Sequence, residues 1–263
     1  MYNSPVASTA EAPRILTALG HPLRWAIVSF LARSDQRVGE LTQLVGQPQN
    51  LVSYHLRELR DAGLVSSRRS SFDARDAYYR LDLDRCGALL ADTAASLHPA
   101  LRPTPIDVAP TPRTGRRPRV LFLCTGNSAR SQMAAALLEH HSANTIEARS
   151  AGSHPKGLHP YAVRVMAERG IDISANTTKH FRRYTRHRFD FVITLCDKVR
   201  EICPEFPGEP ASSHWSLPDP AAIGSTDDET YHAFEQTAEE LETRVRHLIP
   251  QLPTPRGGST DAR

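Results

Sequence analysis

The residue pattern best suited to chemistry is Cys124-Thr-Gly-Asn-Ser-Ala-Arg130-Ser131, in which five residues separate a thiol from a guanidinium. Backbone N–H groups that precede a helix bind tetrahedral oxyanions, and arginine can hold two oxygens of such an anion. Gly126 allows a tight loop. In this positive field we expect the Cys124 thiol to ionise and act as a nucleophile. The alternative is a buried structural cysteine.

The elements on either side position this loop. The apolar run Val120 to Leu123 predicts a buried strand, and an Ala/Leu-rich helix opened by Ser131 follows. A strand, loop and helix in this order place successive backbone N–H groups around one small volume. The predicted substrate-binding residues are therefore those of the loop and the helix start: Thr125, Gly126, Asn127, Ser128, Ala129, Arg130 and Ser131.

Strands and helices alternate through residues 119–250, which predicts a three-layer α/β domain with a parallel sheet. Ligand sites in such sheets lie at the carboxyl ends of the strands. Cys124, Cys196 and Asp219 each follow a predicted strand, so we expect them on one rim. Asp219 lies between two prolines and is a candidate general acid for a departing oxygen. The other reading is an ordinary surface-turn aspartate.

Two further thiols occur in Cys196-Asp-Lys-Val-Arg-Glu-Ile-Cys203-Pro204. Residues seven apart in a regular helix are separated by about 10 Å along its axis. A disulfide requires Cα atoms within roughly 4.4–6.8 Å. The turn between Cys196 and Cys203 must therefore unwind if the two sulfurs are to join, and Pro204 and Gly208 leave room for this.

The loop wording Cys-Thr-Gly-Asn-Ser-Ala-Arg-Ser-Gln-Met-Ala resembles the low-molecular-weight tyrosine phosphatase superfamily, and most of all its thioredoxin-coupled arsenate reductases. The superfamily's catalytic Asp-Pro matches Asp219-Pro220. Phosphatase members often continue with aromatic residues, whereas Ala221 and Ala222 follow here. Family members also often carry a carboxylate that helps to hold a potassium ion at the position of Ala135, so that ion is not expected.

The resemblance implies a catalytic set of Cys124, Arg130, Cys196, Cys203 and Asp219. Cys124 would attack arsenate while Asp219 protonates the leaving oxygen. Cys196 would then attack Cys124 and release arsenite, and Cys203 would attack Cys196. A thioredoxin-like thiol reductant would regenerate the chain as electron donor, with no tightly bound cofactor.

The N-terminal part has a different pattern. Residues 12–97 read as helix, helix, short helix, turn, polar-faced helix and a β-hairpin with a charged tip, then a last helix. This order is typical of a winged helix-turn-helix, mainly α with a β-hairpin wing. The stretches that begin at Ala18 and Val52 resemble the ArsR family of repressors. The resemblance implies binding of a double-stranded DNA operator through the second helix of the motif.

The predicted DNA contacts are polar residues of that helix and its wing: Gln49, Asn50, Ser53, Tyr54, His55, Arg57, Arg68, Arg69 and Arg75. A merely solvated helix face is the alternative. Metalloid-sensing members carry a Cys pair in the preceding short helix, and here Gly39 to Val45 contains none. The inducer is left open, and Cys86 is expected to be a buried apolar residue.

Composition sets the frame for these assignments. The 263 residues suffice for two domains, and the net charge of +3 does not by itself indicate nucleic acid. Four spaced cysteines predict neither a disulfide scaffold nor a metal site. The chain has no membrane-length apolar run and no signal-peptide layout, so we expect a cytoplasmic protein that does not engage a membrane. The expected segments are a flexible N-terminus at 1–11, a DNA-binding domain at 12–97, a Pro/Arg-rich linker at 98–118, the α/β domain at 119–250 and a flexible tail at 251–263.

The sequence therefore predicts a multidomain regulator fused to an arsenate reductase, forming a homodimer through the N-terminal domain. One alternative keeps the DNA-binding half but makes the α/β half a small phosphatase. In another, the loop only binds an arsenate- or phosphate-like oxyanion and signals to the DNA-binding half without turnover.

Overall fold

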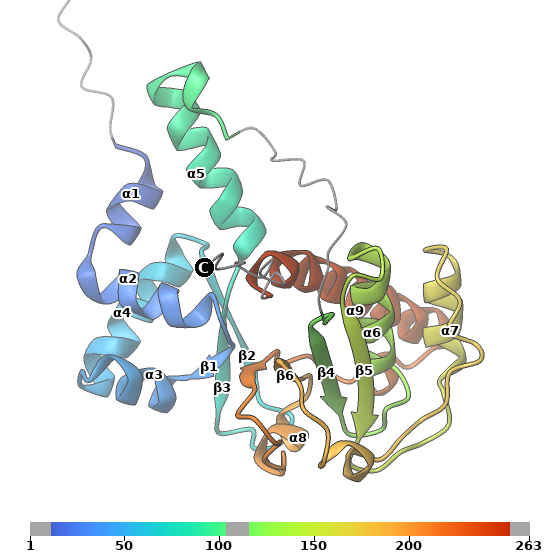
Figure 1. Ribbon diagram of the computed structural model, residues 1–263. Coiled ribbons are helices and arrows are strands. Elements are labelled where there is room, and N and C mark those ends of the chain that lie inside the picture. Colours follow the sequence, from blue (N-terminus) through green and yellow to red (C-terminus); the bar gives the residue numbers. More distant parts are fainter. Residues whose placement is uncertain (1–11, 104–115, 253–263) are drawn as a thin grey trace, which may run out of the picture. The chain divides into compact units, whose positions relative to one another are not determined.

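The computed structural model describes residues 12–103 and 116–252 (Figure 1). The expected flexible N-terminus, most of the linker with Arg113, and nearly all of the tail lie outside these residues. The described chain divides into two compact units. Among the described residues, the first consists of 12–67 with 79–103, and the second of 68–78 with 116–252.

The first unit begins with a set of short helices. Pro22 opens α2 in its first turn, where the missing N–H costs no hydrogen bond, and the His21 side chain accepts from the Leu23 N–H. Gly46 ends α3 with a φ of 62°, a conformation that favours glycine. Ile27, Leu41 and other apolar side chains form its core. The elements are α1 (Arg14–Leu19), α2 (Pro22–Leu31), β1 (Gln36–Arg37), α3 (Val38–Val45) and α4 (Gln49–Asp61).

A hairpin and a long helix follow. Strands β2 (Val65–Arg69) and β3 (Ala77–Leu81) form a sheet with β1 in the order β1-β3-β2. The Asp82 side chain accepts from the Arg85 N–H and so caps α5 (Leu83–Leu97), after which a short 3-10 turn, η1 (Pro99–Leu101), follows. Helices with a hairpin wing are the predicted N-terminal architecture, which is confirmed.

The second unit is built on a four-stranded parallel sheet in the order β5-β4-β6-β7. Its central strand β4 is buried along nearly its whole length, as the apolar run predicted. The strands are β4 (Arg119–Cys124), β5 (Glu147–Gly152), β6 (Phe191–Thr194) and β7 (Ala211–His214).

Helix α6 packs against β4 and β5, and the long helix α9 packs against α6 (Figure 1). Phe122, Met133 and Phe234 are among the fully buried side chains between these layers. The remaining elements are shorter and surround the sheet. Their bounds are α6 (Arg130–His141), α7 (Pro160–Ala167), η2 (Phe181–Tyr184), α8 (Asp197–Glu201), η3 (Pro220–Ala222), α9 (Asp227–Leu248) and η4 (Ile249–Gln251).

The predicted α/β domain with a parallel sheet is confirmed. Within the described ranges, no helix combines the length and apolar character that crossing a membrane requires.

Candidate active site

The loop between β4 and α6 exposes its N–H groups because its carbonyl groups are bonded elsewhere. Each of four loop carbonyls accepts a hydrogen bond from a backbone N–H of the segment after β5. A loop held in this way turns its own N–H groups to the opposite side, where they are available to an anion. The N–H to carbonyl pairs are Ser153 to Cys124 (3.3 Å), His154 to Thr125 (2.8 Å), Lys156 to Gly126 (2.9 Å) and His159 to Ser128 (2.9 Å).

Gly152, the last residue of β5, makes this anchoring possible. A Cβ atom at this position would lie 2.5 Å from the Thr125 carbonyl oxygen and 2.8 Å from the Asn127 nitrogen. Only glycine therefore allows the loop to lie this close to the end of β5.

Asn127 links the loop to the Cys124 sulfur through hydrogen bonds. Its φ is 47°, in the left-handed region that asparagine tolerates better than most residues. Its Oδ1 accepts the Lys179 N–H at 2.7 Å, so its amide group donates to the Ser131 Oγ at 2.9 Å. The single hydroxyl proton of Ser131 is then left for the Cys124 Sγ, 3.0 Å away. The Asn127 N–H lies 3.2 Å from the same sulfur, which is 2 % exposed together with the rest of Cys124.

Arg130 and Asp219 meet beside this loop. Arg130 is 5 % exposed, and its Nη1 donates to the Leu217 carbonyl at 2.8 Å, which aims the guanidinium at the loop opening. Its Nη2 lies 3.4 Å from the Asp219 Oδ2, and the Asp219 side chain is 54 % exposed. Substrate oxygens held by Arg130 would therefore lie beside a carboxyl group that can supply a proton from the solvent side.

Cys196 joins the same rim from the neighbouring strand. The Leu195 N–H donates to the Leu123 carbonyl at 2.7 Å, so β4 and β6 end together. The Cys196 Sγ lies 3.2 Å from the Oγ1 of Thr125, the residue that follows Cys124. Burial raises the pKa of the Cys196 thiol, and the nearby Cys124 adds to this, while Arg130 and Thr125 act in the opposite direction. Both thiols are buried, and the Thr125 hydroxyl connects the Cys196 sulfur to the loop that follows Cys124.

Cys203 lies just beyond α8, which has five residues. Its Sγ donates a weak hydrogen bond to the Pro204 carbonyl at 3.7 Å, and the residue is partly buried against the core of the unit. Burial raises the pKa of this thiol to about 11. A helix of little more than one turn contributes few hydrogen bonds, so the segment from Cys196 to Pro204 has little to hold it wound.

Asp197 anchors the start of α8 and is fully buried. Burial opposes its ionisation, but hydrogen bonds from His214, Ser71 and Ser216 and the charge of Arg68 outweigh it, so its pKa is well below the ordinary value. The Asp197 carboxylate accepts from the Ser216 hydroxyl at 2.7 Å and lies 3.1 Å from the His214 Nε2.

Arg68 differs from the DNA-contact expectation. It is half-buried within the second unit, where its Nη2 lies 2.9 Å from the Asp197 Oδ2. The same guanidinium donates to the carbonyl and hydroxyl of Ser216. Its donors are therefore used inside the protein. Arg69 and Arg75 are exposed, and Arg75 pairs with Asp73 at 2.6 Å.

Helix α4 presents most of the other predicted DNA contacts on one exposed face. His55 is the exception and corrects the expectation. It is 4 % exposed, packs against the His21 ring at 4.3 Å between ring centres, and so cannot face base edges. It lies one turn from Val52 and next to Leu56, on the buried side of the helix. The exposed predicted contacts are Gln49, Asn50, Ser53, Tyr54 and Arg57.

The contacts that three residues make in the site could not be predicted from the sequence. Gly152 and Lys179 act through backbone contacts that depend on the fold. Leu217 acts through its carbonyl group. The Gly in Ser-Ala-Gly152 read only as the end of a strand, because its partner is the loop some 25 positions earlier.

Family comparison agrees with this geometry. Residues 119–256, more than half of the chain, match the model of the low molecular weight phosphotyrosine protein phosphatases. The chain belongs to this family. Residues 21–67 match the bacterial regulatory proteins of the arsR family, so a helix-turn-helix of that family forms its N-terminal part.

The curated relatives of this family member are shorter and match its second half. An arsenate reductase of Shouchella clausii (strain KSM-K16) is 39% identical over 127 residues, which are 48% of this chain and 91% of the relative. An arsenate reductase of Bacillus subtilis (strain 168) is 36% identical over 129 residues, 49% of this chain and 93% of the relative. A solved arsenate reductase in its phosphate-binding state is 30% identical and covers 52% of this chain and 99% of its own, with a TM-score of 0.43.

Proposed function

We propose that this chain is a DNA-binding regulator fused to an arsenate reductase that works by a Cys124–Cys196–Cys203 thiol relay. The observation that carries the proposal is the position of Cys196, whose sulfur lies 3.2 Å from Thr125 in the anion loop. Phosphate ester hydrolysis needs one thiol, whereas a reduction needs a further pair to supply two electrons. Relatives named arsenate reductase, identical at 39% of aligned positions, support the same assignment.

The first step forms a bond between the Cys124 sulfur and arsenic. The loop N–H groups and Arg130 hold the oxygens of hydrogen arsenate, and Asp219 gives its proton to the arsenate hydroxyl group, which leaves as water. Arsenic remains in the +5 state at this stage. Ser131 and Asn127 keep the sulfur aimed at the arsenic through the hydrogen bonds described above.

The second step moves electrons. The Cys196 thiolate attacks the Cys124 sulfur, an S–S bond forms, and the pair of electrons of the S–As bond stays on arsenic, which leaves as arsenite in the +3 state. Cys203 then attacks Cys196, which frees the Cys124 thiolate and leaves a Cys196–Cys203 disulfide. An external dithiol of the thioredoxin class reduces this disulfide.

The test is arsenate reduction by the full chain, with thioredoxin, its reductase and NADPH supplied. We expect Cys196→Ser to abolish turnover. We expect Cys203→Ser to stop after one arsenite per chain with a Cys124–Cys196 disulfide, which peptide mapping detects. Cys86→Ser is the matched control and should retain the wild-type rate. Wild-type turnover in either relay variant would overturn the proposal.

The family itself supports a second candidate, a phosphatase, because Cys124, Arg130 and Asp219 suffice for phosphate ester hydrolysis. Hydrolysis of an aryl phosphate at equal rates in wild type, Cys196→Ser and Cys203→Ser, without arsenate reduction, would favour it. Tight arsenate binding with neither activity would favour a sensor.

The DNA-binding half completes the proposal. The exposed face of α4 would enter the major groove of a double-stranded operator, and two copies would bind as a homodimer through their N-terminal units. The match to the arsR family supports this role. Both activities belong in the cytoplasm, where DNA and thiol reductants occur together.

A further inference from the structure

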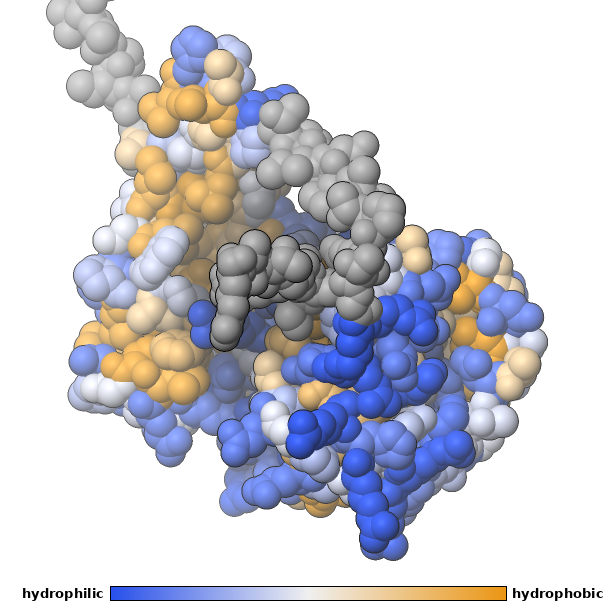
Figure 2. Space-filling view, in the orientation of Figure 1, coloured by the Kyte–Doolittle hydropathy of each residue, from blue (hydrophilic) through white to orange (hydrophobic). Residues whose placement is uncertain are grey.

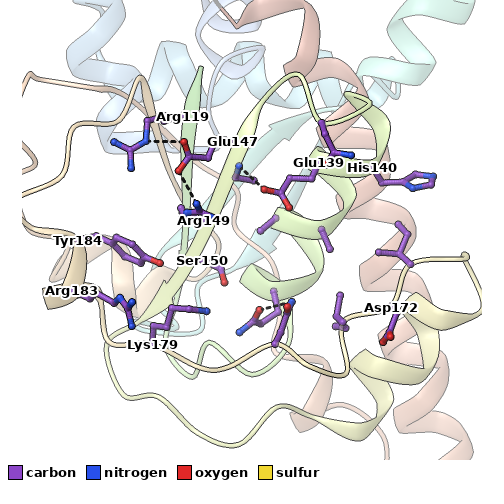
Figure 3. Close-up of a pocket in the computed structure, with 18 of the residues that line it drawn as sticks. Arg119, Glu139, His140, Glu147, Arg149, Ser150, Asp172, Lys179, Arg183 and Tyr184 are labelled. Carbon is purple, nitrogen blue, oxygen red and sulfur yellow. Dashed lines mark hydrogen bonds and ion pairs between the residues drawn. The ribbon is translucent and has the colours of Figure 1, made fainter. Parts of the chain in front are cut away.

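A pocket of about 710 Å³ opens beside β5, the edge strand of the parallel sheet. Figure 2 shows a strongly hydrophilic surface over this side of the second unit. Lys179, Arg183 and Tyr184 lie together at one end of the pocket with Ser150, while His140 and Asp172 lie at the other end (Figure 3).

The free edge of β5 directs the Ser150 N–H into the basic end of the pocket, which is the end that holds Lys179 and Arg183. The N–H groups of Glu147 and Ser153 turn toward β4 and its end, where they donate to Pro118 and Cys124. Since strand residues alternate, those of residues 148, 150 and 152 turn outward. Ala148 donates to the Glu139 side chain and Gly152 to the Lys179 carbonyl. The N–H of Ser150, between them, meets no acceptor within the described residues.

The cations at this end are not neutralised by carboxylates. Arg183 is exposed and makes no ion pair within residues 12–103 and 116–252. The Lys179 Nζ donates only to the Thr177 carbonyl, at 2.6 Å, among the described groups. Burial lowers the pKa of Lys179, and the neighbouring charges of Arg183 and Arg149 lower it further. Like charges held this close are stabilised by an anion between them.

The carboxylates of the pocket are already occupied or lie at the other end. Glu147 bridges Arg119 and Arg149 at 3.3 and 3.0 Å. Glu139 accepts the Ala148 N–H at 3.2 Å, and Asp172 accepts the Ser174 N–H at 2.8 Å. None of them cancels the charge beside Ser150.

Ala135 also lines the pocket. At this position, members of the low-molecular-weight tyrosine phosphatase superfamily often carry a carboxylate that helps to hold potassium. The residues present do not fit that ion, because alanine offers no oxygen and Lys179 and Arg183 would repel a cation. The same residues favour the opposite charge.

We infer that Ser150, Lys179, Arg183 and Tyr184 form a second oxyanion site, separate from the Cys124 loop, that binds a small dianion of the phosphate or sulfate class. The Ser150 N–H and hydroxyl, the Tyr184 hydroxyl and two cationic side chains supply convergent donors. Lys179 also donates its backbone N–H to Asn127 at 2.7 Å, so an anion on its side chain lies one residue from the group that orients the nucleophile.

Equilibrium dialysis of the full chain with radiolabelled inorganic phosphate tests the inference, because two sites give a stoichiometry of two. We expect Arg130→Ala to lose the loop site and retain one phosphate per chain. We expect Arg183→Gln to retain the loop site and to weaken the second site by about tenfold to hundredfold, the effect of losing a charged hydrogen bond. Arg182→Gln, an equally exposed neighbour outside the pocket, is the matched control and should bind as wild type.

A wild-type stoichiometry of one, or no binding to Arg130→Ala, would overturn the inference. Unchanged second-site affinity in Arg183→Gln would also overturn it. Sulfate competition at both sites distinguishes a general dianion site from one selective for phosphate. The measurement involves no turnover, so the failure of the reductase proposal would leave it intact.

Discussion

At the scale of single residues, Asn127 connects the backbone at Lys179 to the thiol of the anion loop. Its carbonyl oxygen is fixed by the Lys179 N–H, which leaves its amide group for Ser131, and Ser131 in turn faces the Cys124 sulfur. Through these three hydrogen bonds, the position of the Lys179 backbone amide determines the groups that surround the Cys124 sulfur. Each group has one role because its neighbours have used its other hydrogen-bonding capacity.

Asn127→Gly tests this chain without straining the backbone, because glycine accepts a φ of 47°. We expect kcat/KM for arsenate to fall by about tenfold to hundredfold, as for loss of buried hydrogen bonds. Asn144→Gly, at an exposed position with a φ of 59°, is the control and should leave kcat/KM unchanged. Equal effects of the two substitutions would contradict the role given to the Asn127 side chain.

Gly152 gives a second residue-scale prediction. In Gly152→Ala the added Cβ meets two backbone atoms of the loop, so the loop must move. We expect a loss of roughly 1–3 kcal/mol in the free energy of unfolding, measured in urea, together with a fall in kcat/KM. Gly157→Ala is matched to it, because nothing lies within 4 Å of its Cβ position. A stable and fully active Gly152→Ala variant would show that the loop does not need this close approach.

At the scale of elements, the parallel strands bring the reactive groups together. β4 and β6 are neighbours in the sheet and end at Cys124 and Thr194, so Cys196 arrives beside the anion loop. The sheet order could not be read from the chain, but the carboxyl-end rule placed both thiols on one rim without it. The turn between Cys196 and Cys203 must unwind if the two sulfurs are to join, and α8 within it has only five residues.

The segment after α8 makes a pH-dependent prediction. The folded chain holds the pKa of Cys203 at about 11, above its ordinary value of 9.0, because burial disfavours the thiolate. Only the thiolate reacts with iodoacetamide, so alkylation of Cys203 should rise about tenfold per pH unit from pH 7 to 9. At pH 7 it should be about a hundredfold faster in denaturant, which peptide mass spectrometry measures. A folded rate that levels off below pH 9 would exclude the raised pKa.

At the scale of the whole molecule, two families of domain occur in one chain. Both could be predicted from local patterns, because the spacing of apolar residues, the loop motif and the hairpin each span no more than a few dozen residues. The errors lie where burial decides. His55 was assigned to the DNA face by its polarity, but its position one turn from Val52 puts it in the core. Arg68 was predicted to contact DNA from the wing. Its ion pair with Asp197 could not be foreseen, because the two residues are distant in the chain.

DNA binding provides the test at this scale. Arg57 lies on the exposed face of α4, so Arg57→Gln should weaken operator binding and reduce the slope of log affinity against log salt by about 1. Arsenate reduction should not change. Arg164→Gln, an exposed cation of α7 paired with Glu168, is the control and should bind DNA as wild type. An unaltered salt slope in Arg57→Gln would remove Arg57 from the interface.

The burial of the relay sulfurs has a consequence for oxidative damage. Cys124 and Cys196 are 2 % and 3 % exposed, and the Cys203 thiol is held protonated by its surroundings. Peroxide oxidises accessible thiolates, so a resting chain offers it little to attack. Hydrogen peroxide is smaller than arsenate, so the anion loop does not exclude it, and burial slows the oxidation of Cys124 without preventing it. Oxidative stress should therefore consume the reducing equivalents of the resting chain slowly rather than at once.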